Sequence, residues 1–270
     1  MNENSTGLRA IRIKGWGHAA FAVTMIGFGI QGLVTHDFAP IWEPVPEGLR
    51  THAVLVYLCA LVALASGIGL LWRRTVSAAA RLLFAFLLLW LLLLRVPHIV
   101  VSPTLDVWYS CCQTLVIVAA AWALYAGFAP DWDRRRFVFA TGDKGVRIAR
   151  VLYGVALIPF GLAHFRFLEA TAPLVPNWLP AHVAWAYFTG ATFVAAGLAM
   201  LIGVYARLAA VLSAWQIGLF TLLVWVPVVA SGAANDAQWG EFVVSWALTA
   251  GGWVVADSYR NISWLAVGKR

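Results

Sequence analysis

Residues 52–71, HAVLVYLCALVALASGIGLL, reappear 130 positions later as residues 182–201, HVAWAYFTGATFVAAGLAML. This offset superposes His52 on His182, Tyr57 on Tyr187 and Gly67 on Gly197. The same or a similar offset pairs further residues outside the stretch: Val96-Pro97 with Val226-Pro227, Phe28-Gly29 with Phe160-Gly161, Trp108 with Trp239, and Trp122 with Trp253. Self-similarity over this length indicates a duplicated structural unit.

The composition is that of a membrane protein. Hydrophobic residues make up 62% of the chain and charged residues 11%, with a mean hydropathy of +0.80. Apolar runs of about twenty residues are long enough to cross a hydrocarbon core of about 30 Å as helices. The sequence therefore predicts an all-α polytopic membrane protein whose eight transmembrane helices lie in segments 17–34, 52–72, 78–97, 108–128, 149–167, 182–202, 208–230 and 241–258.

The eight predicted helices divide into two units of four. The first unit covers residues 1–128, with an N-terminal tail before its first span, and the second covers residues 149–270. A charged linker, residues 129–148, joins them. Because each unit has an even number of spans, both units point the same way and the repeats are parallel.

The formal charge of +7 follows the predicted topology. Sixteen of the 19 Lys and Arg residues (19 − 3) fall on one side of the eight spans, and the three exceptions are Arg50, Arg95 and Arg166. This asymmetry places the linker and both termini in the cytoplasm. The expected partner of the basic residues is anionic membrane lipid and not nucleic acid.

Other features are typical of a helical scaffold. Small residues at four-residue spacing are expected to form helix contact faces: Ala65 and Gly69 in one unit, and Ala191, Ala195 and Ala199 in the other. Tryptophans near span ends are expected to form an interfacial belt: Trp16, Trp42, Trp72, Trp108, Trp178 and Trp239. The cysteines, Cys59, Cys111 and Cys112, have no zinc spacing and are expected to be packing residues, so no metal site is predicted.

Polar residues gather at the predicted outer ends of the helices, where ionisable groups beside a membrane are costly and often functional. The two units differ there. His164 of the second unit corresponds to Gly32 of the first, and Arg95-Val96-Pro97-His98 of the first corresponds to Trp225-Val226-Pro227-Val228 of the second. Arg166 and Glu169 can pair on one helical face. One groove between the units, open outward, would collect these groups; separate helix-capping and loop contacts are the alternative.

Such a groove suits a quinone. Imidazole and guanidinium groups can hydrogen-bond a quinone carbonyl, and an acidic partner can relay the proton. The residues expected to act there are His164 as the catalytic group and, as ligand-binding groups, Arg95, His98, Phe165, Arg166, Glu169, Trp178, His182 and Tyr187. Haem is the less favoured cofactor, because it needs two histidines at one depth, such as His98 and His164.

The second unit resembles the DoxX-like family of four-helix membrane proteins. The resemblance rests on YGVALIPFGLAHF (153–165), APLVPNWLP (172–180) and YFTGATFVAAGLAML (187–201). The first unit matches less well, with Gly32 in place of the histidine, so the chain resembles two fused DoxX-like units. The resemblance implies a bacterial inner membrane protein, and some members, such as the membrane subunit of thiosulfate:quinone oxidoreductase, are linked to quinone reduction.

Two functions fit these features. The first is a membrane subunit that binds quinone in an electron-transfer complex, with a periplasmic or membrane partner that supplies the electrons. The second is non-enzymatic: binding of lipid or another hydrophobic ligand, or assembly of a membrane complex. A transporter is disfavoured because the spans carry no charged residues at mid-depth. The sequence does not decide whether the chain is an enzyme, nor its oligomeric state.

Overall fold

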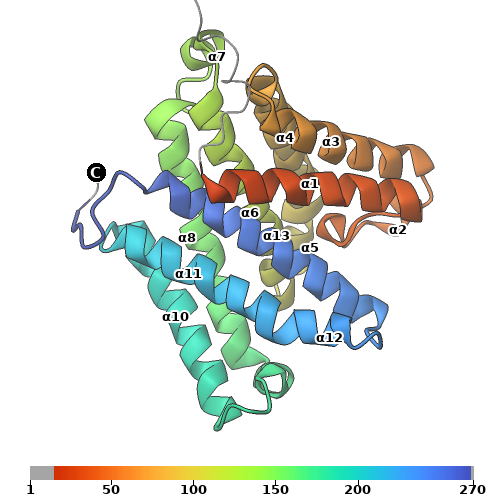
Figure 1. The fold of residues 1–270 in the computed structure, drawn as a ribbon, viewed down its shortest axis with the longest axis vertical. Helices are drawn as coiled ribbons and strands as arrows, with labels where there is room; N and C mark the ends of the chain where they lie inside the picture. The colour runs from red at the N-terminus through yellow and green to blue at the C-terminus, as the bar shows by residue number, and fades with distance from the viewer. Residues whose placement is uncertain (1–14, 269–270) are drawn as a thin grey trace, which may run out of the picture.

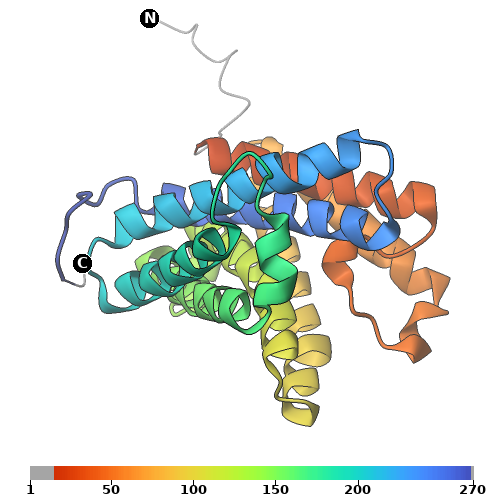
Figure 2. The same ribbon diagram turned by 90° about the horizontal axis from the view of Figure 1, so that it is seen from below.

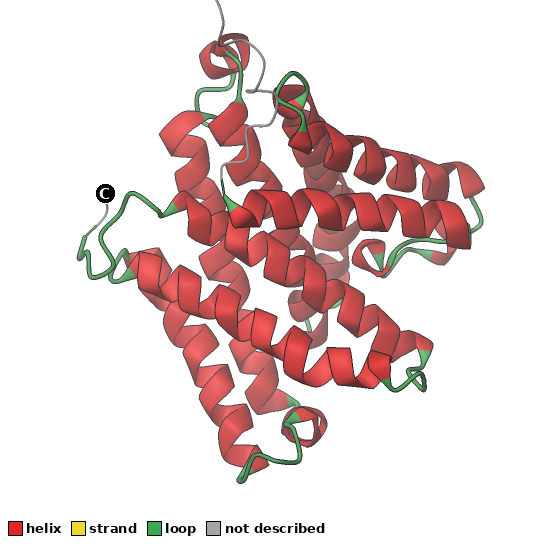
Figure 3. Cartoon of the chain, in the orientation of Figure 1, coloured by secondary structure: helices red, strands yellow, loops and turns green. Residues whose placement is uncertain are grey.

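The computed structural model describes residues 15–268. Figure 1 shows the fold, and Figure 3 shows helices joined by short loops. The first half contains α1 (Trp16–Thr35), η1 (Pro40–Trp42), α2 (Glu47–Arg50), α3 (Ala53–Leu71), α4 (Val76–Trp90), the π-helical segment η2 (Leu91–Arg95), α5 (Val96–Val101) and α6 (Leu105–Phe128). After the linker helix α7 (Asp131–Arg136), the second half contains α8 (Gly142–Arg166), α9 (Leu168–Thr171), η3 (Ala172–Leu174), α10 (His182–Ile202), α11 (Ala206–Phe220), the π-helical segment η4 (Thr221–Trp225), α12 (Val226–Ala230) and α13 (Asp236–Ser258).

By length and apolar composition the chain is a multi-pass membrane protein. Among the described residues, seven helical segments can each cross a membrane: α1, α3, α4 through α5, α6, α8, α10, and α11 through α12. The eighth expected span lies in α13, which has 23 residues but falls outside this set. α13 carries Glu241 and packs against α1, α6 and α11, so neighbouring helices, not lipid, cover much of its surface.

Backbone contacts at glycines hold the first two long helices of each half together. A Cβ added to Gly29 of α1 would lie 2.6 Å from the backbone nitrogen of Leu64 in α3, and one added to Gly67 of α3 would lie 2.7 Å from the Ala22 carbonyl oxygen. In the second half, Gly161 of α8 and Gly190 of α10 approach each other in the same way. Only glycine permits helices to pack this closely.

The contact faces expected at alanines are therefore wrong in part. Gly69 is buried, but Ala65, Ala191 and Ala195 are exposed and Ala199 is half-buried. The buried small residues of α10 are Ala186, Gly190 and Gly197. The small-residue contact face of α10 therefore lies beside the predicted one, at Ala186, Gly190 and Gly197.

The two halves interlock through their last long helices. α6 of the first half packs along α8 of the second, α13 of the second half packs along α1 of the first, and α6 and α13 contact each other. Figures 1 and 2 show α13 beside α1 in both views. The halves therefore share one continuous interface, in which nearly every residue of α6 from Thr114 to Tyr125 is buried.

A π-helical segment precedes each Val-Pro pair. The segment η2 ends at Arg95, before Val96-Pro97, and η4 ends at Trp225, before Val226-Pro227. A proline ring has no N–H and crowds the carbonyl four residues earlier. Widening the preceding turn to the π spacing relieves this conflict without ending the helix.

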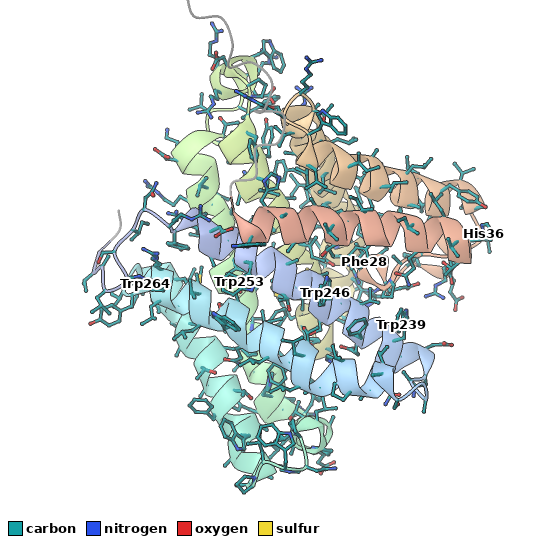
Figure 4. All side chains as sticks on the ribbon, in the orientation of Figure 1. Phe28, His36, Trp239, Trp246, Trp253 and Trp264 are labelled. Atoms are coloured by element: carbon teal, nitrogen blue, oxygen red, sulfur yellow. The ribbon has the colours of Figure 1, made fainter. Side chains whose placement is uncertain are left out.

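The tryptophan belt is partly wrong. Trp16, Trp72, Trp108, Trp178 and Trp239 are all exposed, as an interfacial belt requires, but Trp42 is only 1% exposed. Figure 4 shows Trp239, Trp246 and Trp253 spaced along α13, so tryptophans are not confined to span ends. Trp42 has a packing role, described below.

The glycine contacts predict a sharp contrast within α1. We expect Gly29→Ala to lower the thermal unfolding midpoint of the purified protein, because its Cβ meets α3 backbone, an overpacking effect of about 1–3 kcal/mol. Gly27→Ala, two residues away in open space, is the matched control and should leave the midpoint unchanged or raise it slightly. Equal effects of the two substitutions would contradict the backbone contact.

Candidate functional site

A cavity of about 390 Å³ lies where the first half meets the second. Its walls come from α6, α8, α10, α11, η4 and α13, with residues of α9 and η3 completing them. Most of the lining is apolar, as in typical small-molecule sites. The polar residues that line it are Asp106, Tyr109, Gln113, His164, Thr171, Glu241 and Ser245.

His164 is held in a defined orientation. Its Nδ1 lies 2.7 Å from the carbonyl oxygen of Phe160, one turn earlier in α8. A carbonyl oxygen only accepts hydrogen bonds, so Nδ1 carries the proton, and in the neutral ring Nε2 has a free lone pair. The imidazole packs beside Phe193 and Phe220, with ring centroids 5.6 and 5.7 Å away, and the two phenylalanine rings stack on each other with centroids 6.4 Å apart.

A phenol and a carboxylic acid side chain share the cavity with His164. Tyr109 of α6 packs on Phe160, with ring centroids 5.3 Å apart, and lies close enough to Glu241 of α13 to interact with it electrostatically. Glu241 forms no ion pair among the residues that the structure describes. Tyr109 and Gln113 lie one turn apart on α6 and both line the cavity. An imidazole, a phenol and a carboxyl group, all of which can carry a proton, therefore line one apolar cavity.

Sequence reasoning missed Glu241 and Tyr109. Glu241 is the first residue of the last predicted span, and Tyr109 lies within the fourth. Each stood out as a polar group inside an apolar helix, which is the signal that could have identified it. Their proximity depends on the packing of α6 against α8 and α13, and one sequence does not reveal that packing.

Hydroxyl groups continue from the cavity into the bundle. Ser245, which lines the cavity, has its Oγ 2.7 Å from Oγ1 of Thr221, and Thr221 Oγ1 lies 3.0 Å from Oγ1 of Thr249. Thr221 is the first residue of η4, so these bonds tie the π-helical segment to α13. These hydrogen bonds thereby fix the end of α11, which carries Phe220, against α13, which carries Glu241.

The first half contributes to this cavity through α6, not through the residues expected from α4 and α5. Arg95 is 4% exposed and donates from Nη1 to the Ser110 hydroxyl at 3.2 Å, but it does not line the cavity. Its Nε has no hydrogen-bond partner among the described residues. His98 is exposed on α5 and also lies outside the cavity lining. His98 and His164 therefore do not share the site that bis-histidine haem ligation needs.

The other expected ligand-binding residues lie around the α8–α10 connection, outside the cavity lining. Phe165 stacks on Tyr187, with centroids 5.8 Å apart, on the exposed side of these helices. The Arg166 guanidinium lies 5.5 Å from the Phe167 ring, and Arg166 forms no ion pair with Glu169 in the described part of the chain. The remaining residues are the exposed Glu169 and Trp178 and the half-buried His182, the first residue of α10.

The corresponding place in the first half is filled. Gly32 is offset by 132 residues from His164, and a Cβ added to it would lie 3.0 Å from Ala60 Cβ and 3.4 Å from the Asp37 oxygen. The loop that follows packs Trp42 on Trp90 and Phe86, with centroids 5.1 and 5.6 Å apart. Trp90 Nε1 also donates to the Trp42 carbonyl oxygen at 3.3 Å. An aromatic plug thus occupies this place in the first half, whereas the corresponding place in the second half is a cavity.

Across the described residues, no group of three or more His, Cys, Asp and Glu side chains could hold a metal ion. The three cysteines are buried and unbridged. No protein-family model matches the chain, and no curated protein or solved structure matches it. The chemistry of the site must therefore be argued from its own residues.

The aromatic plug predicts a large stability cost for one tryptophan. Trp42→Ala should lower the free energy of unfolding by about 3–5 kcal/mol, because the neighbours of a buried aromatic cannot fully close the space it leaves. Trp72→Ala, at an exposed tryptophan of the same half, is the control and should change it little. Titration with a denaturing detergent measures both values. A small effect of Trp42→Ala would show that the loop does not plug the first half.

Proposed function

We propose that this chain binds the ring of a quinone in the cavity around His164. The observation that carries the proposal is the arrangement of His164: an oriented imidazole, packed beside the stacked pair Phe193 and Phe220, in an apolar cavity that Tyr109 and Glu241 also line. Flat aromatic surfaces suit a flat ring. Hydrogen-bonding groups at the cavity wall suit its two oxygens.

These residues have distinct roles in the proposal. Reduction of a quinone to a hydroquinone adds two electrons and two protons to the ring oxygens. His164 Nε2 binds one oxygen, as an acceptor from the hydroquinone and, once protonated, as a donor to the quinone. Tyr109 and Gln113 can donate hydrogen bonds to the other ring oxygen. Glu241 supplies the proton that this second oxygen takes up on reduction. The electrons come from a periplasmic or membrane partner with its own redox cofactor, so this chain acts as one subunit of a quinone-linked oxidoreductase.

For the architecture, we propose two fused, parallel DoxX-like units with eight spans in a bacterial inner membrane. The recurring helix order supports this, as do the two π-helical segments, each followed by Val-Pro. The α6–α8 contact is mirrored by the α13–α1 contact. In Figure 1, α7 and the C-terminal segment lie at the upper left and α2 and α12 toward the right. We assign the α7 end to the cytoplasm because most Lys and Arg residues belong to it.

Binding of a lipid or another hydrophobic ligand without redox chemistry is the second candidate. A groove of about 570 Å³ runs between α10 and α11 and is lined mainly by apolar side chains, including Trp185, Phe188 and Trp215. Phe220 lines both this groove and the His164 cavity. A molecule with a long apolar chain fits this groove, whether or not a quinone ring occupies the cavity.

Quinone binding to the purified full chain tests the proposal. A short-chain quinone should bind saturably, and His164→Ala should weaken binding about tenfold, which corresponds to about 1.4 kcal/mol and the loss of one hydrogen bond. His98→Ala removes an exposed histidine outside the cavity lining and is the matched control. Isothermal titration calorimetry gives the three affinities.

Two results would contradict the quinone assignment. One is the absence of saturable binding to the unaltered protein, and the other is equal affinity of the His164→Ala and unaltered proteins. Extraction of the purified protein with organic solvent, followed by mass spectrometry, separates the two candidates. A copurifying quinone supports the first, and phospholipid alone supports the second.

A further inference from the structure

A second pocket, of about 240 Å³, lies at the opposite end of the second half. It is formed by the first turns of α8, the turn between α10 and α11, and the segment that follows α13. The charged groups in its lining are Arg147 and Arg150. Apolar side chains, including Val151, Leu201 and Ile262, form the adjoining wall.

Arg150 is fixed in place by the end of α13. Its Nε donates to the Ser258 hydroxyl at 2.9 Å, its Nη2 donates to the Ser258 carbonyl oxygen, and its guanidinium carbon lies 3.9 Å from the centre of the Tyr259 ring. None of these partners is a carboxylate. The positive charge is therefore oriented but not neutralised by an ion pair among the described residues.

Arg147 adds a second guanidinium on the same face. It lies three residues before Arg150 in α8, is exposed, and forms no ion pair in the part of the chain that the structure describes. Residues three apart are neighbours on a helix surface. The nearby carboxylate of Asp143 is a single negative charge beside two guanidiniums. The two positively charged guanidinium groups of Arg147 and Arg150 repel each other, and an anion bound between them would offset this repulsion.

The segment after α13 is held as a wall of the pocket. Arg207 Nη1 donates to the Ile262 carbonyl oxygen at 2.8 Å, and its guanidinium carbon lies 4.1 Å from the Trp264 ring centre. The Tyr205 backbone N–H donates to the Ala266 oxygen at 2.9 Å. Figure 1 shows this segment beside the start of α11, and Figure 4 labels Trp264 within it.

The first half has a different pair of side chains at the equivalent place. His18, offset by 132 residues from Arg150, is 2% exposed, and its Nε2 lies 3.0 Å from the Leu70 carbonyl oxygen. Its ring packs on Phe128, which is offset by 131 residues from Tyr259, with centroids 5.2 Å apart. In the first half, the buried His18 packs on Phe128 at this place. In the second half, Arg150 and Tyr259 take the equivalent positions and border a pocket.

We propose that this pocket binds the phosphate of an anionic phospholipid headgroup. Guanidinium groups match phosphate oxygens in a bidentate geometry. The apolar wall formed by Val151, Leu201 and Ile262 gives the glycerol and acyl groups a surface, which a free phosphate ion would not use. Basic pockets between helices at the cytoplasmic end are suited to such headgroups.

The test is lipid binding to the purified full chain in neutral detergent, measured by native mass spectrometry. Phosphatidylglycerol should bind more tightly than phosphatidylcholine with the same acyl chains. Arg147→Gln should weaken phosphatidylglycerol binding about fivefold, from the loss of one cationic side chain near the headgroup. Arg136→Gln, at an exposed arginine of α7 outside the pocket, is the charge-matched control and should have no effect.

Arg150→Lys keeps the charge but loses the planar fork, so it should weaken phosphatidylglycerol binding. Because the substitution also removes the hydrogen bonds to Ser258, the thermal unfolding midpoint of this variant is measured beside the lipid affinity. Three results would overturn the proposal: equal affinity for the two lipids, equal losses in Arg147→Gln and Arg136→Gln, or displacement of the lipid by inorganic phosphate. The last would mark a free-phosphate site. Because quinone affinity is not measured, these results are independent of the function proposed for the His164 cavity.

Discussion

Backbone-to-backbone contact at glycines is the constraint on which the rest of this structure depends. In a membrane, lipid chains are as apolar as leucine side chains, so no hydrophobic force presses the helices together. The pairs α1–α3 and α8–α10 are instead brought together at Gly29, Gly67, Gly161 and Gly190. With these pairs fixed, α6 and α13 fill the space between the halves, and the cavities lie along their edges.

The two halves differ at positions that the sequence offset aligns. In the first, Trp42 and its aromatic neighbours fill the outer position, and His18 with Phe128 fills the inner one. In the second, His164 and Arg150 each border a cavity. Filling one half with close-packed aromatic groups stabilises the bundle, while the other half keeps the unfilled polar positions that a ligand requires. In the function that we propose, the first half is chiefly a scaffold for the second.

The sequence predicted the helices well because apolar length and repetition are local properties of the chain. It also singled out His164, since that position differs between the two repeated segments. It did not predict that Glu241 and Tyr109 line the same cavity, because their proximity depends on how α6 and α13 cross α8. It placed the contact face of α10 on Ala191 and Ala195 although Gly190 and Gly197 are buried, since one-residue shifts around a helix leave the spacing unchanged. The sequence predicted that Arg95 lies with His164, but the buried Arg95 donates to Ser110 of α6, and neither of these two residues lines the cavity.

The central claim is that one ligand ring occupies the second half and none the first. An experimental density map of the protein purified from its own membrane tests this most directly. The account predicts ring-shaped density within hydrogen-bonding distance of His164 Nε2, beside Phe193 and Phe220, and only protein density around Trp42. A cavity closed by collapsed side chains, or one filled solely by an acyl chain, would contradict it.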